Sequence, residues 1–275
     1  LNTVLYEKND VSVNSNFNLS SNKNKVLSLV DGLESMVLGN VFYASTFDVN
    51  PTRVEVGKPM SSFRGYIFEG IYQTGNTDGG TPGHAKYKDL DGVAGITADD
   101  IGTVGDGNPD FTWGWNLDVD IKDFNINMVF EGAQGNDIYN FQRMRMMGLG
   151  SGQFHPTHGD FRDSWTTTNP SNTIHAGTQE ARNTNKWLSS QWIEDGSYTS
   201  LKSMSVTYNF GDRFSNFGIE QVKLFVNAEN LFIITDYSGF DPVSTASGNS
   251  DVDLGIDLNA FPISKSFSVG FNLTF

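Results

Sequence analysis

The 275-residue sequence contains no cysteine, which excludes disulfides and thiolate metal sites. Cations are also scarce: 18 Lys and Arg stand against 32 Asp and Glu, a formal net charge of −14. This balance argues against a nucleic-acid partner, because neutralising phosphates needs an excess of cations. No run of about 18 apolar residues is present, so a transmembrane helix is excluded. Membrane-spanning strands remain possible, because they present lipid with only every second side chain.

Motifs of the common enzyme classes are missing as well. The sequence has no HExxH and no nucleophile elbow, and its glycine clusters do not open a helix after a strand. The acid pairs Glu194-Asp195 and Asp99-Asp100 could suggest a glycosidase. Glycoside hydrolysis, however, needs two carboxylates opposed across the bond, which adjacent acids in turns do not supply. We therefore expect a protein that is not an enzyme.

Strict alternation of apolar and polar residues is the strongest positive signal. In residues 111–121 the odd positions are large and apolar, and the even positions are Thr, Gly, Asn or Asp. Successive side chains of a strand point to opposite faces, so such a segment has one apolar and one polar face. The pattern predicts about eight strands, near Val11–Ser20, Met36–Val49, Gly65–Gln73, Phe111–Ile121, Phe124–Glu131, Tyr198–Phe210, Ile219–Ile234 and Ser264–Phe275.

The lengths of the strands and of their connections favour a membrane barrel. Several strands reach the roughly nine to eleven residues that a tilted strand needs to cross a bilayer. The turn at residues 122–123 is minimal, whereas long polar segments lie near 74–110, 132–197 and 236–263. Outer-membrane barrels combine short periplasmic turns with long extracellular loops. The fold class predicted is an all-β, transmembrane, antiparallel β-barrel with these three segments as extracellular loops.

Two alternatives remain open on the pattern alone. A soluble β-sandwich that binds carbohydrate would bury the apolar faces between two sheets. A stand-alone eight-stranded membrane barrel would serve as an adhesin or structural protein.

Short motifs in a shared order resemble the SusC/RagA family of TonB-dependent outer-membrane transporters. The motifs are VGKP at 56–59, GYIFEGIYQ at 65–73, YKDLDG at 87–92, GNPDFTWG at 107–114, QGNDIYN at 134–140, WIEDGSY at 192–198, NAENLF at 227–232, TDYSGFDP at 235–242 and Phe275. They resemble the C-terminal part of the barrel, so residues 1–275 are expected to form part of a barrel of about 22 strands. Neither the plug domain of the family nor a TonB box is visible in the sequence.

The resemblance implies an importer of glycans, oligosaccharides or peptides in the outer membrane of a Gram-negative, Bacteroidetes-like cell. Its implied partners are a SusD-like surface lipoprotein that lids the barrel, outer-membrane lipid and the barrel-insertion machinery. TonB would act through the missing N-terminal region. The resemblance implies that no cofactor is required.

An acidic segment at residues 89–100 resembles an altered EF-hand loop. Asp89, Asp91 and Asp100 fall at loop positions one, three and twelve, and Gly95 and Thr97 fall at seven and nine. Oxygen ligands at this spacing suit Ca²⁺, which would act structurally. Val93 and Ala94, however, replace a ligand and the turn glycine of such loops. The alternative is a loop with solvated acids.

Three tryptophans in the longest polar segment, Trp165, Trp187 and Trp192, are candidates for stacking on sugar rings. The alternative is that they pack the loop. His155 and His158 with Asp160 have a spacing that a metal could use, although a chance arrangement in a polar loop is the better explanation.

The last strand resembles the signal that the outer-membrane insertion machinery reads. It alternates and ends on an aromatic residue, with its apolar row at Phe267, Val269, Phe271, Leu273 and Phe275. The same row would also serve simply to close the sheet.

Overall fold

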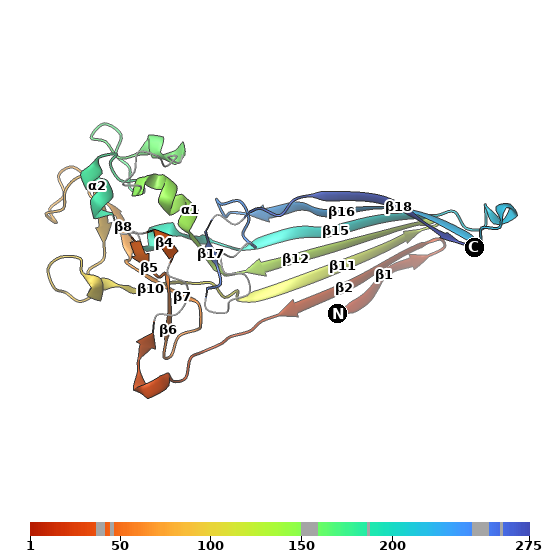
Figure 1. Cartoon of the computed structure of the whole chain (residues 1–275), viewed down its shortest axis with the longest axis horizontal. Coiled ribbons are helices and arrows are strands. Elements are labelled where there is room, and N and C mark those ends of the chain that lie inside the picture. The colour runs from red at the N-terminus through yellow and green to blue at the C-terminus, as the bar shows by residue number, and fades with distance from the viewer. Residues whose placement is uncertain (37–41, 45–46, 150–158, 186–187, 244–252, 259–260) are drawn as a thin grey trace.

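A long, single-layered sheet projects from a compact body of loops, as the computed structural model of the chain shows (Figure 1). The structure describes residues 1–36, 42–44, 47–149, 159–185, 188–243, 253–258 and 261–275.

The sheet has seven antiparallel strands that follow one another in chain order. They are β1 (Asn2–Lys8), β2 (Val11–Ser20), β11 (Phe111–Ile121), β12 (Phe124–Gln134), β15 (Tyr198–Asn209), β16 (Gln221–Thr235) and β18 (Ser266–Thr274). Two-residue turns join β1 to β2 and β11 to β12, where Asn9 and Lys122 each adopt a φ of 53°. Such a positive φ matches the twist that tight hairpins require.

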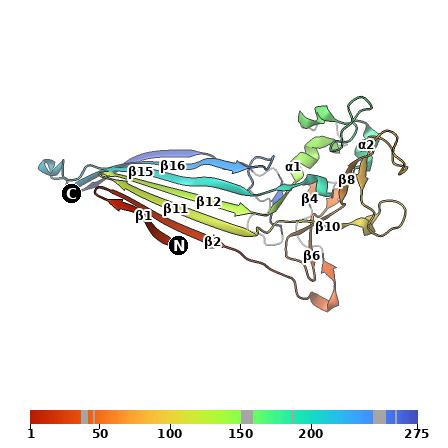
Figure 2. The same ribbon diagram turned by 180° about the vertical axis from the view of Figure 1, so that it is seen from behind.

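The three long connections, residues 21–110, 135–197 and 236–265, all leave the sheet at the end opposite these turns (Figures 1 and 2). Together they form what we call the loop body. Its short strands are β3 (Ser35–Met36), β4 (Phe42–Ala44), β5 (Phe47–Val49), β6 (Thr52–Glu55), β7 (Ser62–Gly65), β8 (Phe68–Ile71), β9 (Ala85–Tyr87), β10 (Gly102–Asp106), β13 (Asp137–Asn140), β14 (Ile193–Asp195) and β17 (Ile256–Asp257).

Helices in the loop body are short. They are α1 (Phe141–Met144), α2 (Gln179–Thr184), a π turn at Arg145–Leu149 and 3₁₀ turns at Val30–Gly32, Ala98–Asp100, Gly159–Asp163 and Ser190–Trp192. One further 3₁₀ turn, Ser215–Phe217, lies between β15 and β16. Within the described residues, no helix has both the length and the apolar character needed to cross a membrane.

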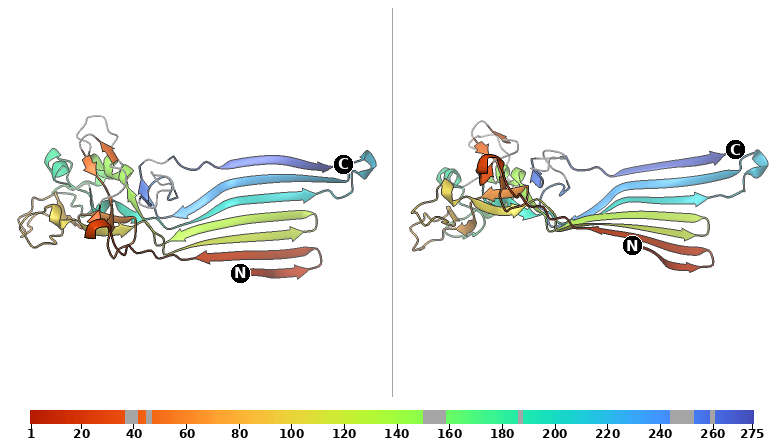
Figure 3. Two further views of the ribbon diagram at one scale, coloured as in Figure 1. Left: turned by 60° about the horizontal axis from the view of Figure 1, so that its bottom comes forward. Right: turned by 90° about the horizontal axis from the view of Figure 1, so that it is seen from below.

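Strand register gathers the apolar side chains on one face of the sheet. Trp115 stands opposite Phe17 on β2 and Phe130 on β12, and its ring stacks on that of Phe130 at 5.3 Å between centroids. The face is open: Val269 and Phe271 are 71% and 68% exposed. No second sheet covers it in the part of the chain that the structure describes (Figure 3). The β-sandwich alternative is therefore wrong, because it requires these rows to meet in a dry interior.

The two outermost strands, β1 and β18, each pair on one side only among the described residues. An open sheet edge does not persist in lipid, because its unpaired N–H and C=O groups find no partner there. The sheet is thus part of a larger barrel wall and not a closed eight-stranded barrel.

Six of the predicted strands lie in the sheet, and two do not. The region Met36–Val49 contributes only β4, β5 and the end of β3, with residues 37–41 and 45–46 outside the described residues, and Gly65–Gln73 contributes β8 and the last residue of β7. In the second region Gly70 adopts a φ of 123° and Ile71 is buried in the loop body. The pattern missed β1, where a bulge between Val4 and Tyr6 breaks the alternation.

The two faces of the sheet predict opposite chemical accessibility at adjacent residues of β16. Val226 lies on the apolar face opposite Val206 and Val269, and Asn227 lies on the polar face opposite Ser205 and Ser268. This chain contains no native cysteine. A single Val226→Cys or Asn227→Cys change in the full-length protein therefore gives this chain one thiol, and the two variants can be compared with each other. We expect a small membrane-impermeant thiol reagent to label Asn227→Cys in intact membranes and to leave Val226→Cys unlabelled.

The control is denaturation in detergent, after which both variants should react. Equal labelling of the two variants in intact membranes would show that the sheet does not separate lipid from water.

Candidate functional site: the polar face and the loop body

The polar face of the sheet carries a ladder of amides and carboxylates. The side-chain amide of Asn125 donates to Asp118 at 3.2 Å and to Asp120 at 2.9 Å, and that of Asn127 donates to Asp118 at 3.1 Å. Ser12 donates to Asp120 at 3.0 Å, which extends the ladder from β12 across β11 to β2. These groups are not buried, so water or a polar solute can replace individual bonds of the ladder.

The loop body has its own hydrophobic core, which draws on all three long connections. Phe63 from the first, Tyr139 from the second and Ile256 from the third are fully buried in one cluster. Strands β13 and β17 pair in parallel there, with Tyr139 opposite Ile256. Burial raises the pKa of the Tyr139 hydroxyl, since the phenolate form would lose its hydration. The described parts of the three long connections therefore share one folded core.

Two of the three candidate tryptophans, Trp165 and Trp192, pack the loop body. Trp192 is 1% exposed in the same cluster, and Trp165 is buried in a second cluster with Ile71 and Tyr87. Neither ring presents a face to solvent, so the packing alternative describes both better than stacking on sugar. Trp187 lies outside the described residues.

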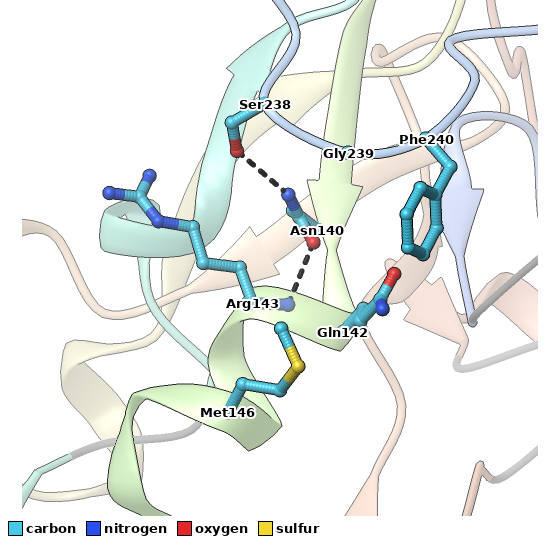
Figure 4. A pocket seen from close by; sticks show the side chains of 7 residues that line it. All are labelled: Asn140, Gln142, Arg143, Met146, Ser238, Gly239 and Phe240. Atoms are coloured by element: carbon cyan, nitrogen blue, oxygen red, sulfur yellow. Dashed lines mark hydrogen bonds between the residues drawn. The ribbon is translucent and has the colours of Figure 1, made fainter. Parts of the chain in front are cut away.

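A polar network around Glu194 joins the second connection to the third. Its carboxylate accepts from the Arg143 guanidinium at 3.0 Å, from the Asn140 amide at 3.1 Å, and from the backbone N–H and hydroxyl of Ser238 at 2.8 and 2.9 Å. Asn140 in turn donates to Ser238 and caps α1 by accepting from the Arg143 backbone N–H (Figure 4). The alternation pattern could not find these residues, because loops have no period.

A pocket beside this network opens between α1 and the third connection, where the ring of Phe240 lies near Gln142 (Figure 4). Phe240 is 64% exposed, unlike the two buried tryptophans. Among the described residues of the loop body it is thus a better aromatic platform than those the sequence singled out.

The acidic segment brings three of its predicted ligands together. One carboxylate oxygen from each of Asp89, Asp91 and Asp100 lies within 4.8 Å of the others. Asp100 is fully buried and accepts backbone N–H groups of Leu90 and Thr97 at 2.7 and 2.8 Å. The chain's own N–H groups thus already hold this carboxylate in place.

The remaining predicted ligands fit less well. The Thr97 hydroxyl accepts from the backbone N–H of Asp99 at 3.2 Å, and Gly95 turns with a φ of 102°. Convergent carboxylates suit a hard cation, so Ca²⁺ binding stays a prediction. Of the other metal candidates, His155 and His158 lie outside the described residues, and Asp160 contacts Arg143 at 3.5 Å.

The apolar row of the last strand is exposed on the edge strand β18, at Phe267, Val269, Phe271 and Leu273, with Phe275 following. This position is compatible with both sheet closure and recognition by the insertion machinery, which stays a prediction.

Comparison with known proteins gives the following likenesses. No protein-family model matches the chain. It is 33% identical to the TonB-dependent receptor P3 of Formosa agariphila over 94% of this chain and 26% of that protein. It is 30% identical to the TonB-dependent receptor P26 of the same organism, over 100% and 28%. The TonB-dependent receptor SusC of Bacteroides thetaiotaomicron is 22% identical over 94% and 24%.

In structure, the chain is similar to one described as the RagAB peptide transporter, with a TM-score of 0.78 and 22% identity. The match covers 100% of this chain and 28% of that one. The chain therefore spans about a quarter of the length of the proteins it matches.

The Glu194 network predicts a loop-body defect on neutralisation. Glu194→Gln keeps the shape but removes the charge that binds Arg143, and Glu194 is only 13% exposed. We expect a loss of about 1–3 kcal/mol in local stability, seen as faster limited proteolysis of the loop body in the folded full-length protein. The matched control is Glu69→Gln, whose exposed contact with Lys86 is 4.0 Å long and whose loss should cost at most about 1 kcal/mol. Equal proteolysis of the two variants would contradict the role of Glu194.

A second prediction concerns the acidic segment. If Ca²⁺ binds Asp89, Asp91 and Asp100, millimolar Ca²⁺ should raise the melting temperature of the full-length protein above its value in chelator. Asp91→Asn should remove most of this shift. Asp99→Asn, a neighbour that does not belong to the cluster, should keep it. Absence of any Ca²⁺-dependent shift in the unaltered protein would refute the site.

Proposed function

The chain belongs to the TonB-dependent receptors of the SusC and RagA type, and on that premise we propose that the complete protein imports a glycan, oligosaccharide or peptide across the outer membrane. This chain forms part of the barrel wall together with its loop body, and it corresponds to the C-terminal part of the barrel. The transport role is non-enzymatic.

One observation carries the proposal: a single sheet has an exposed apolar face and a hydrogen-bonding polar face along the same strands. An apolar outer band and a polar interior are what a barrel needs to stand in lipid and to hold a water-filled passage. The ladder around Asp118 and Asn125 lines that passage. Donors and acceptors that are open to water cost a passing solute little to displace.

The location and the partners follow the family. Receptors of this type are outer-membrane proteins, and we place this chain as a multi-pass wall segment in a Bacteroidetes-like cell. The open end of the sheet, where the loop body lies, would face outward and meet a SusD-like lipoprotein lid. TonB would act through a plug domain supplied by the rest of the protein, and the insertion machinery would read the strand β18.

Growth on large and small forms of one nutrient tests the function. Cells without the full-length gene should fail to grow on the oligomeric cargo but should grow normally on its monomers, which pass through general porins. Complementation with the full-length gene should restore growth. The gene's neighbourhood suggests which oligomers to offer. Recovery of the protein in the soluble fraction would overturn the proposal. So would normal growth of the cells without the gene on every oligomer offered.

A further inference from the structure

A cavity of about 270 Å³ lies on the polar face where β12, β15 and β16 enter the loop body. Its floor is one row across the three strands, in which Ser200 stands opposite Glu131 on one side and Ile233 on the other. Its roof is the third long connection, which contributes Phe240 and Ile263. Phe240 also borders the pocket of Figure 4, so the two hollows adjoin at this ring.

The roof is held by hydrogen bonds within the chain. The buried carboxylate of Asp241 accepts the backbone N–H of Val243 at 2.9 Å and that of Ile263 at 3.2 Å, which ties the two ends of the third connection together. The Asn230 amide donates to the Ser264 carbonyl at 3.2 Å and fixes this end to β16. The cavity is therefore a preformed feature of the fold.

A buried hydroxyl in the floor has no partner. Ser200 is 7% exposed, and its Oγ makes no hydrogen bond with any described residue. A buried polar group without a partner is unfavourable, and most such groups in proteins are satisfied. A bound molecule that supplies a donor or acceptor at this point would remove the cost.

Charges of both signs line the same space. Lys202 and Glu131 form a half-exposed pair with 3.4 Å between Nζ and Oε1. Lys265 adds a second cation, and within the described residues it pairs with no acid. The Asp241 carboxylate is already occupied by backbone N–H groups. The lining is thus formally neutral, with two cations and two carboxylates, but the Lys265 ammonium pairs with neither carboxylate among the described residues.

The apolar part of the lining is mainly aliphatic. Ile233, Val243, Pro262 and Ile263 outnumber the aromatic lining residues, Phe232 and Phe240, and the register places Phe232 opposite Leu201 in the row of the apolar face. Aliphatic surface suits alkyl side chains, whereas sugar rings are best buried against flat aromatic faces. An aliphatic wall, a free hydroxyl and an unpaired cation match the side chains, backbone and terminal carboxylate of a peptide.

We propose that this cavity binds the carboxyl-terminal end of a short peptide, with Lys265 on the terminal carboxylate and Ser200 on the backbone. The cavity is slightly smaller than the roughly 300–1,000 Å³ of typical small-molecule sites, so it holds a few residues of the cargo and not the whole. The assignment rests on the proposed import function and specifies its cargo as peptide.

Calorimetry on the full-length protein in detergent tests the assignment. The probes are a synthetic tetrapeptide mixture with free carboxyl ends, the same mixture amidated at that end, and maltoheptaose. We expect the free peptides to bind about tenfold more tightly than the amidated ones, and maltoheptaose not to compete. Lys265→Gln should abolish the preference for the free carboxylate. Ser200→Val should weaken both peptide mixtures about three- to tenfold, the range of one hydrogen bond.

Ser203→Val is the matched control, because it lies on the polar face of the same strand but outside the cavity lining. It should leave all affinities unchanged, and near-ultraviolet spectra should show that each variant is folded. Binding of maltoheptaose that Ser200→Val weakens, or peptide affinities that neither cavity variant changes, would overturn the assignment. The growth experiment distinguishes failure of the cavity assignment from failure of the import function. If cells that carry the cavity variants still import an oligomer, the import function stands whatever the outcome for the cavity.

Discussion

The pairing of backbone N–H and C=O groups in lipid is the constraint on which this structure depends. Hydrocarbon offers these groups no partner, so each strand of a membrane sheet must have a neighbour on both sides. Strands β2, β11, β12, β15 and β16 have a neighbour on both sides within the chain. Among the described residues, β1 and β18 have a neighbour on one side only. The outer edges of β1 and β18 are therefore where the rest of the barrel must join.

The same constraint explains why the loop body is built differently. Once the chain leaves lipid, water can satisfy the backbone, and stability must come from burial instead. The three long connections bury their apolar residues together. They share one core around Phe63, Tyr139 and Ile256, and they are joined by the charge-assisted hydrogen bonds of Glu194. These contacts join the described parts of the three connections into one folded unit at the end of the sheet.

Sequence alone predicted the wall closely and the loop body poorly, for a physical reason. A strand between lipid and water must alternate at every residue, so the bounds of β2 and β11 could be read directly from the pattern. The bulge in β1 broke the alternation and hid that strand. In the loop body burial has no period: Trp192 was a candidate for sugar contact, yet it is a core residue, while Phe240 drew no attention. The convergence of Asp89, Asp91 and Asp100 was predictable because ligand spacing is local.

The junction between wall and loop body is where the two kinds of structure meet, and the strands are irregular there. The register of β15 with its neighbours shifts at Lys202, and on β16 Asn230 adopts a φ of 53°. A bulge bends its strand and re-aims the side chains beside it. These two irregularities place Lys202 against Glu131 and direct Asn230 to the roof at Ser264. Regular strand pairing would continue the polar face of amides and carboxylates that lies nearer the tight turns. The irregularities at Lys202 and Asn230 make possible a cavity with mixed charge and an aliphatic lining where the sheet meets the loop body.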